Sequence, residues 1–170
     1  MTVFAFDYSA DVVLKDGSTV HLRPIRGDDD DRLLALLQRM SEEALYYRFL
    51  TIPKIDRERA QQLTRVDPDR QRVLVAEYSD EIVATAGYYV GAHADRAEVA
   101  FAVADAWRGR GIGTRMLECL AEIGRRSGIR IFDAYVLGEN RRMVNDDYAD
   151  VGVGAPGEQR LAHLLAHRGR

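Results

Sequence analysis

The feature that most constrains this chain is a short glycine-rich segment between a strand-like pattern and a helix-like pattern. The segment reads Arg108-Gly109-Arg110-Gly111-Ile112-Gly113-Thr114. Residues 96–104 before it alternate in character as strand residues do, and apolar residues after it recur at helical spacing through Ser127. Glycines let the backbone approach a ligand closely, and the first amides of a helix have no intrahelical acceptor. This strand-loop-helix unit therefore predicts a site for an anion such as a pyrophosphate.

The rest of the chain predicts one domain of the α+β class, with a largely antiparallel sheet leading into that unit. An Asp16-Gly17 turn between two β-rich runs indicates a hairpin. The acidic run 27–31 favours a helix start, since carboxylates stabilise the positive end of a helix dipole. We expect this run to be solvated rather than to bind a metal. The predicted strands are 11–14, 19–25, 72–78, 82–90, 96–104 and 129–136, and the predicted helices are 27–40, 41–49, 56–64 and 111–127.

Composition argues against several classes of function. The 170 residues carry 24 Lys and Arg against 27 Asp and Glu, a net charge of −3, which does not indicate a nucleic-acid-binding protein. No apolar run reaches membrane-spanning length, and no Lys or Arg precedes the short apolar N-terminal stretch. We therefore expect a soluble cytoplasmic protein with no membrane partner. The single cysteine, Cys119, is expected in the core, and the four histidines show no metal-ligand spacing.

Three phosphate-binding patterns can be compared with the glycine-rich segment. A Walker loop needs Gly-Lys-Ser/Thr at its end, and no lysine is present there. A dinucleotide-binding fingerprint needs a third glycine where Thr114 stands, and that fold also needs several more β-α units, for which too few residues are expected after Val136. The pattern Arg/Gln-x-x-Gly-x-Gly/Ala fits from Arg108 to Gly113 at every position. A plain glycine-rich turn with solvated arginines is the ordinary structural alternative.

The segment resembles the acetyl-CoA motif of the GCN5-related N-acetyltransferase (GNAT) superfamily. The likeness extends over residues 11–143 and is closest to the acetyltransferase domain of bacterial protein lysine acetyltransferases that modify acyl-CoA synthetases. The segments that carry it are Val13-Leu14-Lys15-Asp16-Gly17, His21-Leu22-Arg23-Pro24-Ile25, Ala97-Glu98-Val99-Ala100-Phe101, Asp105-Ala106-Trp107-Arg108-Gly109-Arg110-Gly111 and Glu139-Asn140-Arg141-Arg142-Met143. It implies the GNAT fold, with helices on both faces of a mixed sheet, and acetyl-CoA as co-substrate without a metal.

The resemblance also implies which residues bind the co-substrate. In this superfamily the strand before the loop has a bulge, splays from its neighbour and offers amides to pantetheine and the acetyl carbonyl. By resemblance, the residues that would contact acetyl-CoA are Ala102, Val103, Arg108, Gly109, Arg110, Gly111, Gly113, Thr114 and Asn140.

Two residues are implied as catalytic, each with an ordinary alternative. Glu98 occupies the position of the family's glutamate and would accept the proton of the amine; the alternative is a surface glutamate on a strand. Tyr148 would protonate the departing thiolate, as tyrosines of the following helix do in relatives; the alternative is a core aromatic residue. Asn140 has the same ambiguity, since asparagine is common in turns.

The likeness weakens after Met143. Asn140 to Tyr148 is one residue longer than the usual family spacing, and an insertion in a helix rotates all later residues of that helix by about 100°. Residues 158–170 suggest a short polar helix, so the last strand of the fold is predicted to be missing or altered. We assign residues 1–153 to the GNAT domain and 154–170 to a divergent tail.

The predicted function is acetyl transfer from acetyl-CoA to an amine, most simply a protein lysine, with an acyl-CoA synthetase as a possible partner. The alternatives are a small-molecule amine acceptor, or a CoA-binding regulatory or catalytically impaired domain, which the altered C-terminus would favour.

Overall fold

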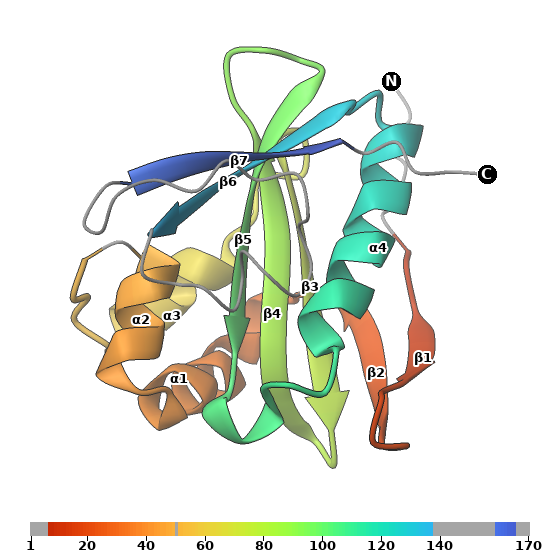
Figure 1. Ribbon diagram of the computed structural model, residues 1–170. Coiled ribbons are helices and arrows are strands. Elements are labelled where there is room, and N and C mark those ends of the chain that lie inside the picture. The colour runs from red at the N-terminus through yellow and green to blue at the C-terminus, as the bar shows by residue number, and fades with distance from the viewer. Residues whose placement is uncertain (1–6, 50, 138–158, 166–170) are drawn as a thin grey trace.

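The computed structural model describes residues 7–49, 51–137 and 159–165, and it contains one sheet whose strands follow chain order (Figure 1). All neighbouring strands are antiparallel except β5 and β6, which are parallel. The strands are β1 (Ala10–Val13), β2 (Thr19–Pro24), β3 (Gln71–Tyr78), β4 (Glu81–Val90), β5 (Arg96–Val103), β6 (Ile131–Leu137) and β7 (Gln159–Leu165). The α+β GNAT-type architecture predicted from the sequence is confirmed.

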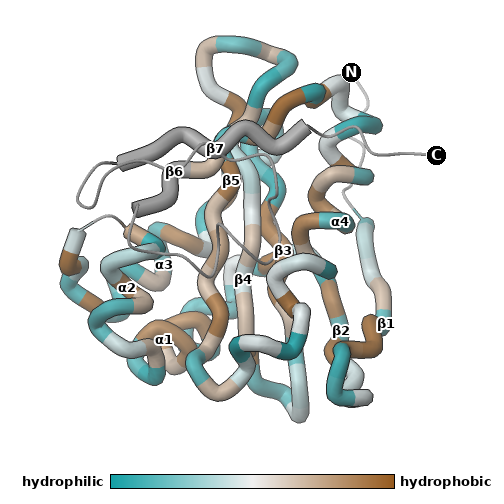
Figure 2. The backbone as a smooth tube through the Cα atoms, in the orientation of Figure 1, coloured by the Kyte–Doolittle hydropathy of each residue, from teal (hydrophilic) through white to brown (hydrophobic). Residues whose placement is uncertain are grey.

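Helices cover both faces of this sheet. Figure 1 shows α1 (Asp30–Arg39), α2 (Glu42–Phe49) and α3 (Arg57–Thr64) on one side and α4 (Ile112–Arg126) on the other. Two short 3-10 turns, η1 (Gly27–Asp29) and η2 (Asp105–Trp107), precede α1 and the glycine-rich loop. Figure 2 shows hydrophobic segments along the strands and on the sides of the helices that face them. The sheet therefore separates two cores.

The first core lies between the sheet and α4. Met116 and Leu120 of α4 are fully buried there. Gly124 is required because an added Cβ would lie 2.8 Å from the Phe132 ring of β6. The helix ends at Gly128, whose φ of +83° suits glycine, as the sequence predicts.

The second core lies between the sheet and α1–α2, and includes Leu33, Leu37 and Leu45. The faces of β5 are divided as the alternation predicts. Val99 belongs to the α4 core and Ala102 to the α1–α2 core. Consequently Glu98, which alternates with Val99, lies on the side of α1–α3.

The prediction of a missing last strand and a helix in 158–170 is wrong. β7 pairs antiparallel with β6 along its whole length, from Leu137↔Gln159 to Ile131↔Leu165. Leucines at 161, 164 and 165 fit one helical turn, but their spacing does not reveal that β6 has a free edge. An antiparallel partner satisfies the amides and carbonyls of that edge, which overrides the local pattern. The boundary at 153/154 lies outside the described residues and stays a prediction.

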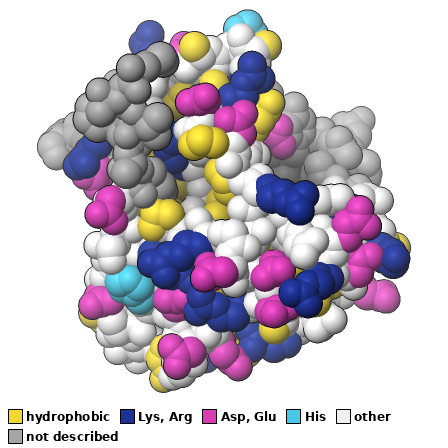
Figure 3. Space-filling view, turned by 180° about the vertical axis from the view of Figure 1, so that it is seen from behind, with side chains coloured by type: hydrophobic (Ala, Val, Ile, Leu, Met, Phe, Trp, Pro, Cys, Tyr) yellow, Lys and Arg dark blue, Asp and Glu magenta, His cyan; other side chains and the backbone are white. Residues whose placement is uncertain are grey.

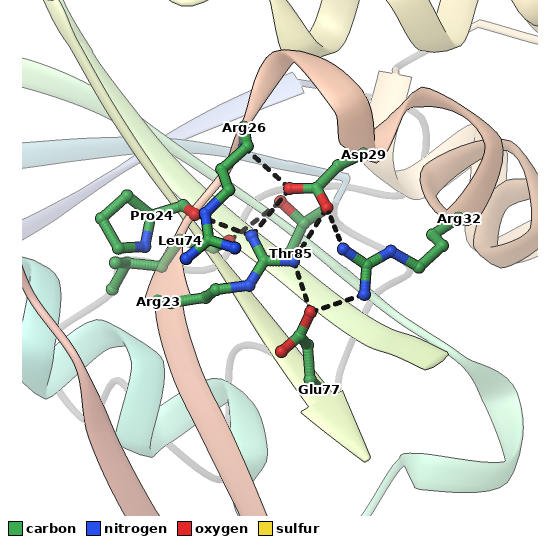
Figure 4. Close-up of polar contacts among 8 residues, drawn as sticks. All are labelled: Arg23, Pro24, Arg26, Asp29, Arg32, Leu74, Glu77 and Thr85. Atoms are coloured by element: carbon green, nitrogen blue, oxygen red, sulfur yellow. Dashed lines mark hydrogen bonds and ion pairs between the residues drawn. The ribbon is translucent and has the colours of Figure 1, made fainter. Parts of the chain in front are cut away.

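The acidic run also departs from expectation, because Asp29 is buried and not solvated. Its side chain is 0% exposed and accepts hydrogen bonds from Arg23 at 2.7 and 2.8 Å. Arg32 and the Arg26 amide also donate to Asp29, at 2.6 and 2.7 Å. Figure 4 shows Arg23 and Arg32 both reaching Glu77 of β3 as well. This four-residue network of Arg23, Asp29, Arg32 and Glu77 ties β2, the start of α1 and β3 together.

We predict that this network makes the protein sensitive to acid. Burial raises the pKa of Asp29, but the hydrogen bonds from Arg23 and Arg26 outweigh it and hold that pKa below its ordinary value. Hydrogen bonding to Arg23 likewise lowers the pKa of Glu77. A carboxyl whose pKa is lower in the folded than in the unfolded protein stabilises the fold fully at pH values above its unfolded-state pKa, which is about 3.9 for Asp and about 4.3 for Glu. This stabilisation is lost as the pH falls through the folded-state pKa.

Urea unfolding as a function of pH tests this. The free energy of unfolding is expected to be constant near neutrality and to fall steeply below about pH 4. Asp29→Asn should flatten that fall. An equally steep fall in the variant would contradict the assignment.

Charges of both signs are mixed on the face of the molecule opposite to the one seen in Figure 1. Figure 3 shows basic and acidic side chains interspersed over the lower half of this face. Within the described ranges, no helix is long and apolar enough to cross a membrane.

Candidate functional site

A split in the sheet lies beside the glycine-rich loop. β5 and β6 pair only at Arg96↔Ile131, Ala97↔Phe132 and Glu98↔Asp133, whereas β5 stays paired with β4 as far as Val103↔Ala84. Arg96 closes one end of the split through two bonds to Asp133, at 2.8 and 3.1 Å. Beyond Glu98 the two strands diverge (Figure 1). The splay implied by the family resemblance is therefore present.

The register of β5 shows which backbone groups face this split. The Ala104 amide donates to the Val83 carbonyl at 2.9 Å, so the amides of alternate residues in β5, including Ala102, point toward β4. The amides of Phe101 and Val103 then point toward the split. This register favours Val103 over Ala102 as a ligand contact. The pairing of β4 with β5 shows no register shift, so the expected bulge in β5 is not found.

The glycine-rich loop leads from β5 to α4 with the geometry its sequence predicts. Gly109 and Gly111 have φ values of +74° and +84°, which residues with a Cβ rarely adopt. Gly111 is the N-cap of α4, whose first helical bond runs from the Arg115 amide to its carbonyl at 3.1 Å. Among the described residues, no acceptor lies opposite the amides of Gly109, Gly111 and Gly113. A Cβ on Gly113 would meet open space, so this helix start can receive an anion.

The two arginines of the loop are held by neighbouring carboxylates. Arg108 Nε lies 3.2 Å from Asp105, and Arg110 lies 3.0 Å from Asp16 in the β1–β2 turn. Arg110 also stacks over Trp107, with 4.4 Å from its guanidinium carbon to the ring centroid. Both pairs are half-exposed, so an incoming phosphate can share these guanidinium groups.

Sequence reasoning missed the contribution of Lys15. Its amide donates to the Arg110 carbonyl at 3.1 Å, and its aliphatic stem lies against Gly111. The hairpin turn thus supports the loop from the side and adds a third cation. Its only sequence signal is its place in the Lys15-Asp16-Gly17 turn, which by itself indicates a hairpin.

On the opposite face of the sheet, a pocket of about 290 Å³ lies between β4–β5 and the helices α1–α3. We call it the α2–α3 pocket. The lining residues used below are Arg48, Phe49, Leu63, Arg65, Tyr89, Glu98 and Ala100. Since Glu98 and Ala100 belong to β5, the pocket opens beside the split.

Glu98 lies where it can reach two spaces. It is exposed and lines both the α2–α3 pocket and a second hollow of about 210 Å³ formed with Tyr89, His93 and Asp133. It accepts no hydrogen bond from any residue the structure describes. A carboxylate so placed is free to take up a proton from a group that enters the pocket.

Of the other residues singled out from the sequence, the structure describes some and not others. Thr114 lies in the first turn of α4 and is half-buried. Asn140 and Tyr148 lie outside the described residues. Cys119 lies 2.8 Å from the Tyr8 hydroxyl, and burial raises the pKa of its thiol, which fits the predicted core role. In the described part of the chain no cluster of three or more His, Cys, Asp or Glu side chains could hold a metal.

Comparison with known proteins finds relatives of this chain. The family model of the acetyltransferase (GNAT) family matches residues 34–145. Acetyltransferase Pat of Mycolicibacterium smegmatis is 33% identical over 142 residues, which is 82% of this chain but only 43% of that protein. The crystal structure of the GNAT domain of S. lividans PAT has a TM-score of 0.79 at 35% identity, and the match covers 91% of this chain and 94% of that one.

A more distant structure shares the fold. YncA from Salmonella typhimurium, solved with its cofactor acetyl-CoA, has a TM-score of 0.68 at 16% identity, with 90% of this chain and 97% of that chain covered.

Proposed function

Because this chain belongs to the acetyltransferase (GNAT) family, we propose that it transfers the acetyl group of acetyl-CoA to the amine of a protein lysine. The observation that carries the proposal is the joint position of three features. The split between β5 and β6 begins beside Glu98, the glycine-rich loop lies at the far end of β5, and the α2–α3 pocket opens on the other side. A thioester in the split would thus lie between an anion site and a proton acceptor.

The chain's own residues fit the co-substrate. The unpaired amides of Gly109, Gly111 and Gly113 would bind the pyrophosphate, together with Arg108 and Arg110. The Val103 amide would receive the pantetheine arm, and Thr114 would add a hydroxyl at the helix start. Asn140 and Ala102 complete the proposed set on family resemblance alone. YncA, which shares the fold, was solved with acetyl-CoA.

Glu98 is the proposed general base. A lysine amine has a pKa near 10.4, so it enters mostly as an ammonium and must lose a proton before it can act as a nucleophile. Glu98 would accept that proton directly or through a water. The new N–C bond then forms as the C–S bond breaks, and the thiolate takes up a proton, for which Tyr148 is the proposed donor.

The protein acceptor is proposed from similarity to Pat and PAT, whose acetyltransferase domains this chain resembles. An acyl-CoA synthetase is the proposed partner on the same ground. The alternative of a regulatory or impaired domain was suggested by the altered C-terminus. β7 supplies a last strand, while the longer spacing from Asn140 to Tyr148 lies outside the described residues. The other alternative is a small-molecule amine as acceptor, and the experiment below distinguishes it from a protein lysine.

The proposal is tested by incubating the protein with acetyl-CoA and an acyl-CoA synthetase, and measuring free thiol release and acetyl-lysine by mass spectrometry. Acetylation of one or a few lysines, dependent on this protein, is expected. Saturable CoA binding by calorimetry with no acetylation of the synthetase or of any added amine would overturn the enzymatic function. Turnover with small amines only would overturn the protein acceptor.

Gly111→Ala is predicted to weaken CoA binding, because alanine at φ +84° costs about 1–2 kcal/mol and its Cβ would lie 3.2 Å from Lys15. Displacing the helix-start amides should raise the Kd for CoA by about tenfold or more, the effect of one charge-assisted hydrogen bond. Gly128→Ala is the matched control, since it places alanine at φ +83° at the opposite end of α4 with no neighbour within 4 Å, and it should leave the Kd unchanged. Calorimetry and thermal melting measure both variants. Equal CoA affinities in the two would contradict the role of Gly111.

A further inference from the structure

The α2–α3 pocket has an excess of positive charge. Arg48 and Arg65 line it, and Glu98 is the single acidic side chain among its lining residues. Arg48 of α2 stacks on Phe49, with its guanidinium carbon 4.8 Å from the ring centroid, and Arg59 of α3 lies 5.7 Å from the same ring. Two guanidinium groups therefore line a pocket that is proposed to receive a cationic amine, and a third, that of Arg59, lies against Phe49, which also lines the pocket.

These guanidinium groups are not neutralised within the described part of the protein. Arg57, on the same helix as Arg59, lies 3.5 Å from both Asp30 and Asp31, whereas Arg48, Arg59 and Arg65 form no ion pair. Like charges repel one another, and a charge that is partly removed from water without a partner is costly, so an anion would stabilise this group of arginines. The contrast with Arg57 indicates an anion that is supplied from outside.

Arg48 is the member placed deepest. Its side chain is half-buried, and desolvation lowers the pKa of Arg48 to about 10, while attraction to Glu98 opposes the decrease. The group therefore remains charged at neutral pH. No side-chain nitrogen or oxygen in the described residues is both fully buried and unpartnered. The guanidinium nitrogens of Arg48 therefore keep some exposed surface, and Arg48 is one of the residues that line the pocket.

We propose that the acceptor lysine lies next to an acidic residue in the substrate protein, and that Arg48, with Arg59 and Arg65, binds that carboxylate. This inference rests on the proposed function, and it specifies the class of acceptor. An isolated ammonium entering the pocket would be repelled by three cations and attracted by Glu98 alone. A carboxylate beside the lysine compensates this repulsion and orients the amine toward Glu98.

The experiment compares two peptides that each contain one lysine and differ only in Glu or Gln at the flanking positions. With wild-type protein and acetyl-CoA, kcat/KM for the Glu peptide is expected to exceed that for the Gln peptide by about tenfold or more, the effect of one charge-assisted hydrogen bond. Arg48→Gln should bring the ratio close to one, and Arg48→Lys should keep part of it. Arg125→Gln, on the outer surface of α4, removes the same charge elsewhere and should keep the full ratio.

Two further measurements keep the test decisive. Arg65 is exposed, so Arg65→Gln lowers the ratio without disturbing the fold even if Arg48→Gln proves unstable on melting. Equal kcat/KM for the two peptides in the wild type would overturn the inference while leaving acetyl transfer to lysine intact. No acetylation of either peptide or of the synthetase, despite measured CoA binding, would overturn the proposed function itself. Faster acetylation of free glutamate than of either peptide would overturn the assignment to a protein lysine.

Discussion

Glu98→Gln is expected to lower kcat/KM for lysine acetylation by roughly 10²–10⁴, the usual contribution of a general base. The amide keeps the shape of the side chain but cannot accept the proton of the ammonium. CoA affinity should be unchanged, because Glu98 lies on the face of β5 that lines the α2–α3 pocket, away from the glycine-rich loop. Steady-state kinetics and CoA calorimetry on the same preparation measure the two effects separately.

A pH series sharpens this test. As pH rises toward the lysine pKa near 10.4, a growing share of the amine is already deprotonated, so the deficit of Glu98→Gln should shrink. Glu42→Gln, at the exposed start of α2, is the matched control and should behave as wild type. A variant that keeps wild-type kcat/KM at neutral pH would exclude Glu98 as the base.

Asp29→Ala is expected to destabilise the fold by about 3–5 kcal/mol, because it leaves the buried Arg23 without its principal partner. Glu77 would remain as an acceptor for Arg23, but it does not replace the two hydrogen bonds that Asp29 accepts from Arg23, and Arg32 is itself a cation. Urea unfolding at neutral pH measures the loss.

Asp31→Ala is the control for this variant. Asp31 belongs to the same acidic run, but its side chain is 72% exposed and lies 3.5 Å from Arg57, so its removal should change stability by less than about 1 kcal/mol. Equal losses in the two variants would show that Asp29 stabilises α1 through the helix start alone and not through the buried network.

The sequence predicts those elements whose conformation is set by residues close to one another along the chain. The Asp16-Gly17 hairpin, the alternation in β5, the glycine-rich loop and the apolar stripe of α4 each depend on residues a few positions apart, and all are found. Local backbone preference and side-chain periodicity are sufficient for such elements. The position of Glu98 on the α1–α3 side of the sheet results from the same alternation.

Errors arose where local spacing had two solutions. Leucines at 161, 164 and 165 fit a helical turn, yet the unpaired edge of β6 makes this segment a strand. Asp29 belongs to a run that suits a solvated helix start, yet the buried Arg23 of β2 pairs with it in the interior. In the first case the deciding partner is distant in sequence, and in the second it is only six residues away but belongs to another element of the fold.

By itself, then, the sequence determined the class of fold, the glycine-rich loop that is proposed to bind the anion, and the strand that bears the proposed base. Only the tertiary structure decided how far β5 and β6 stay paired, and therefore where the split opens. It alone brought Arg48 of α2 and Arg65, from the segment after α3, to one pocket with Glu98, and placed Arg59 of α3 against Phe49 beside them. The physical reason is that backbone geometry is set by near neighbours, whereas a charged pocket is a sum over elements that meet only when the chain has folded.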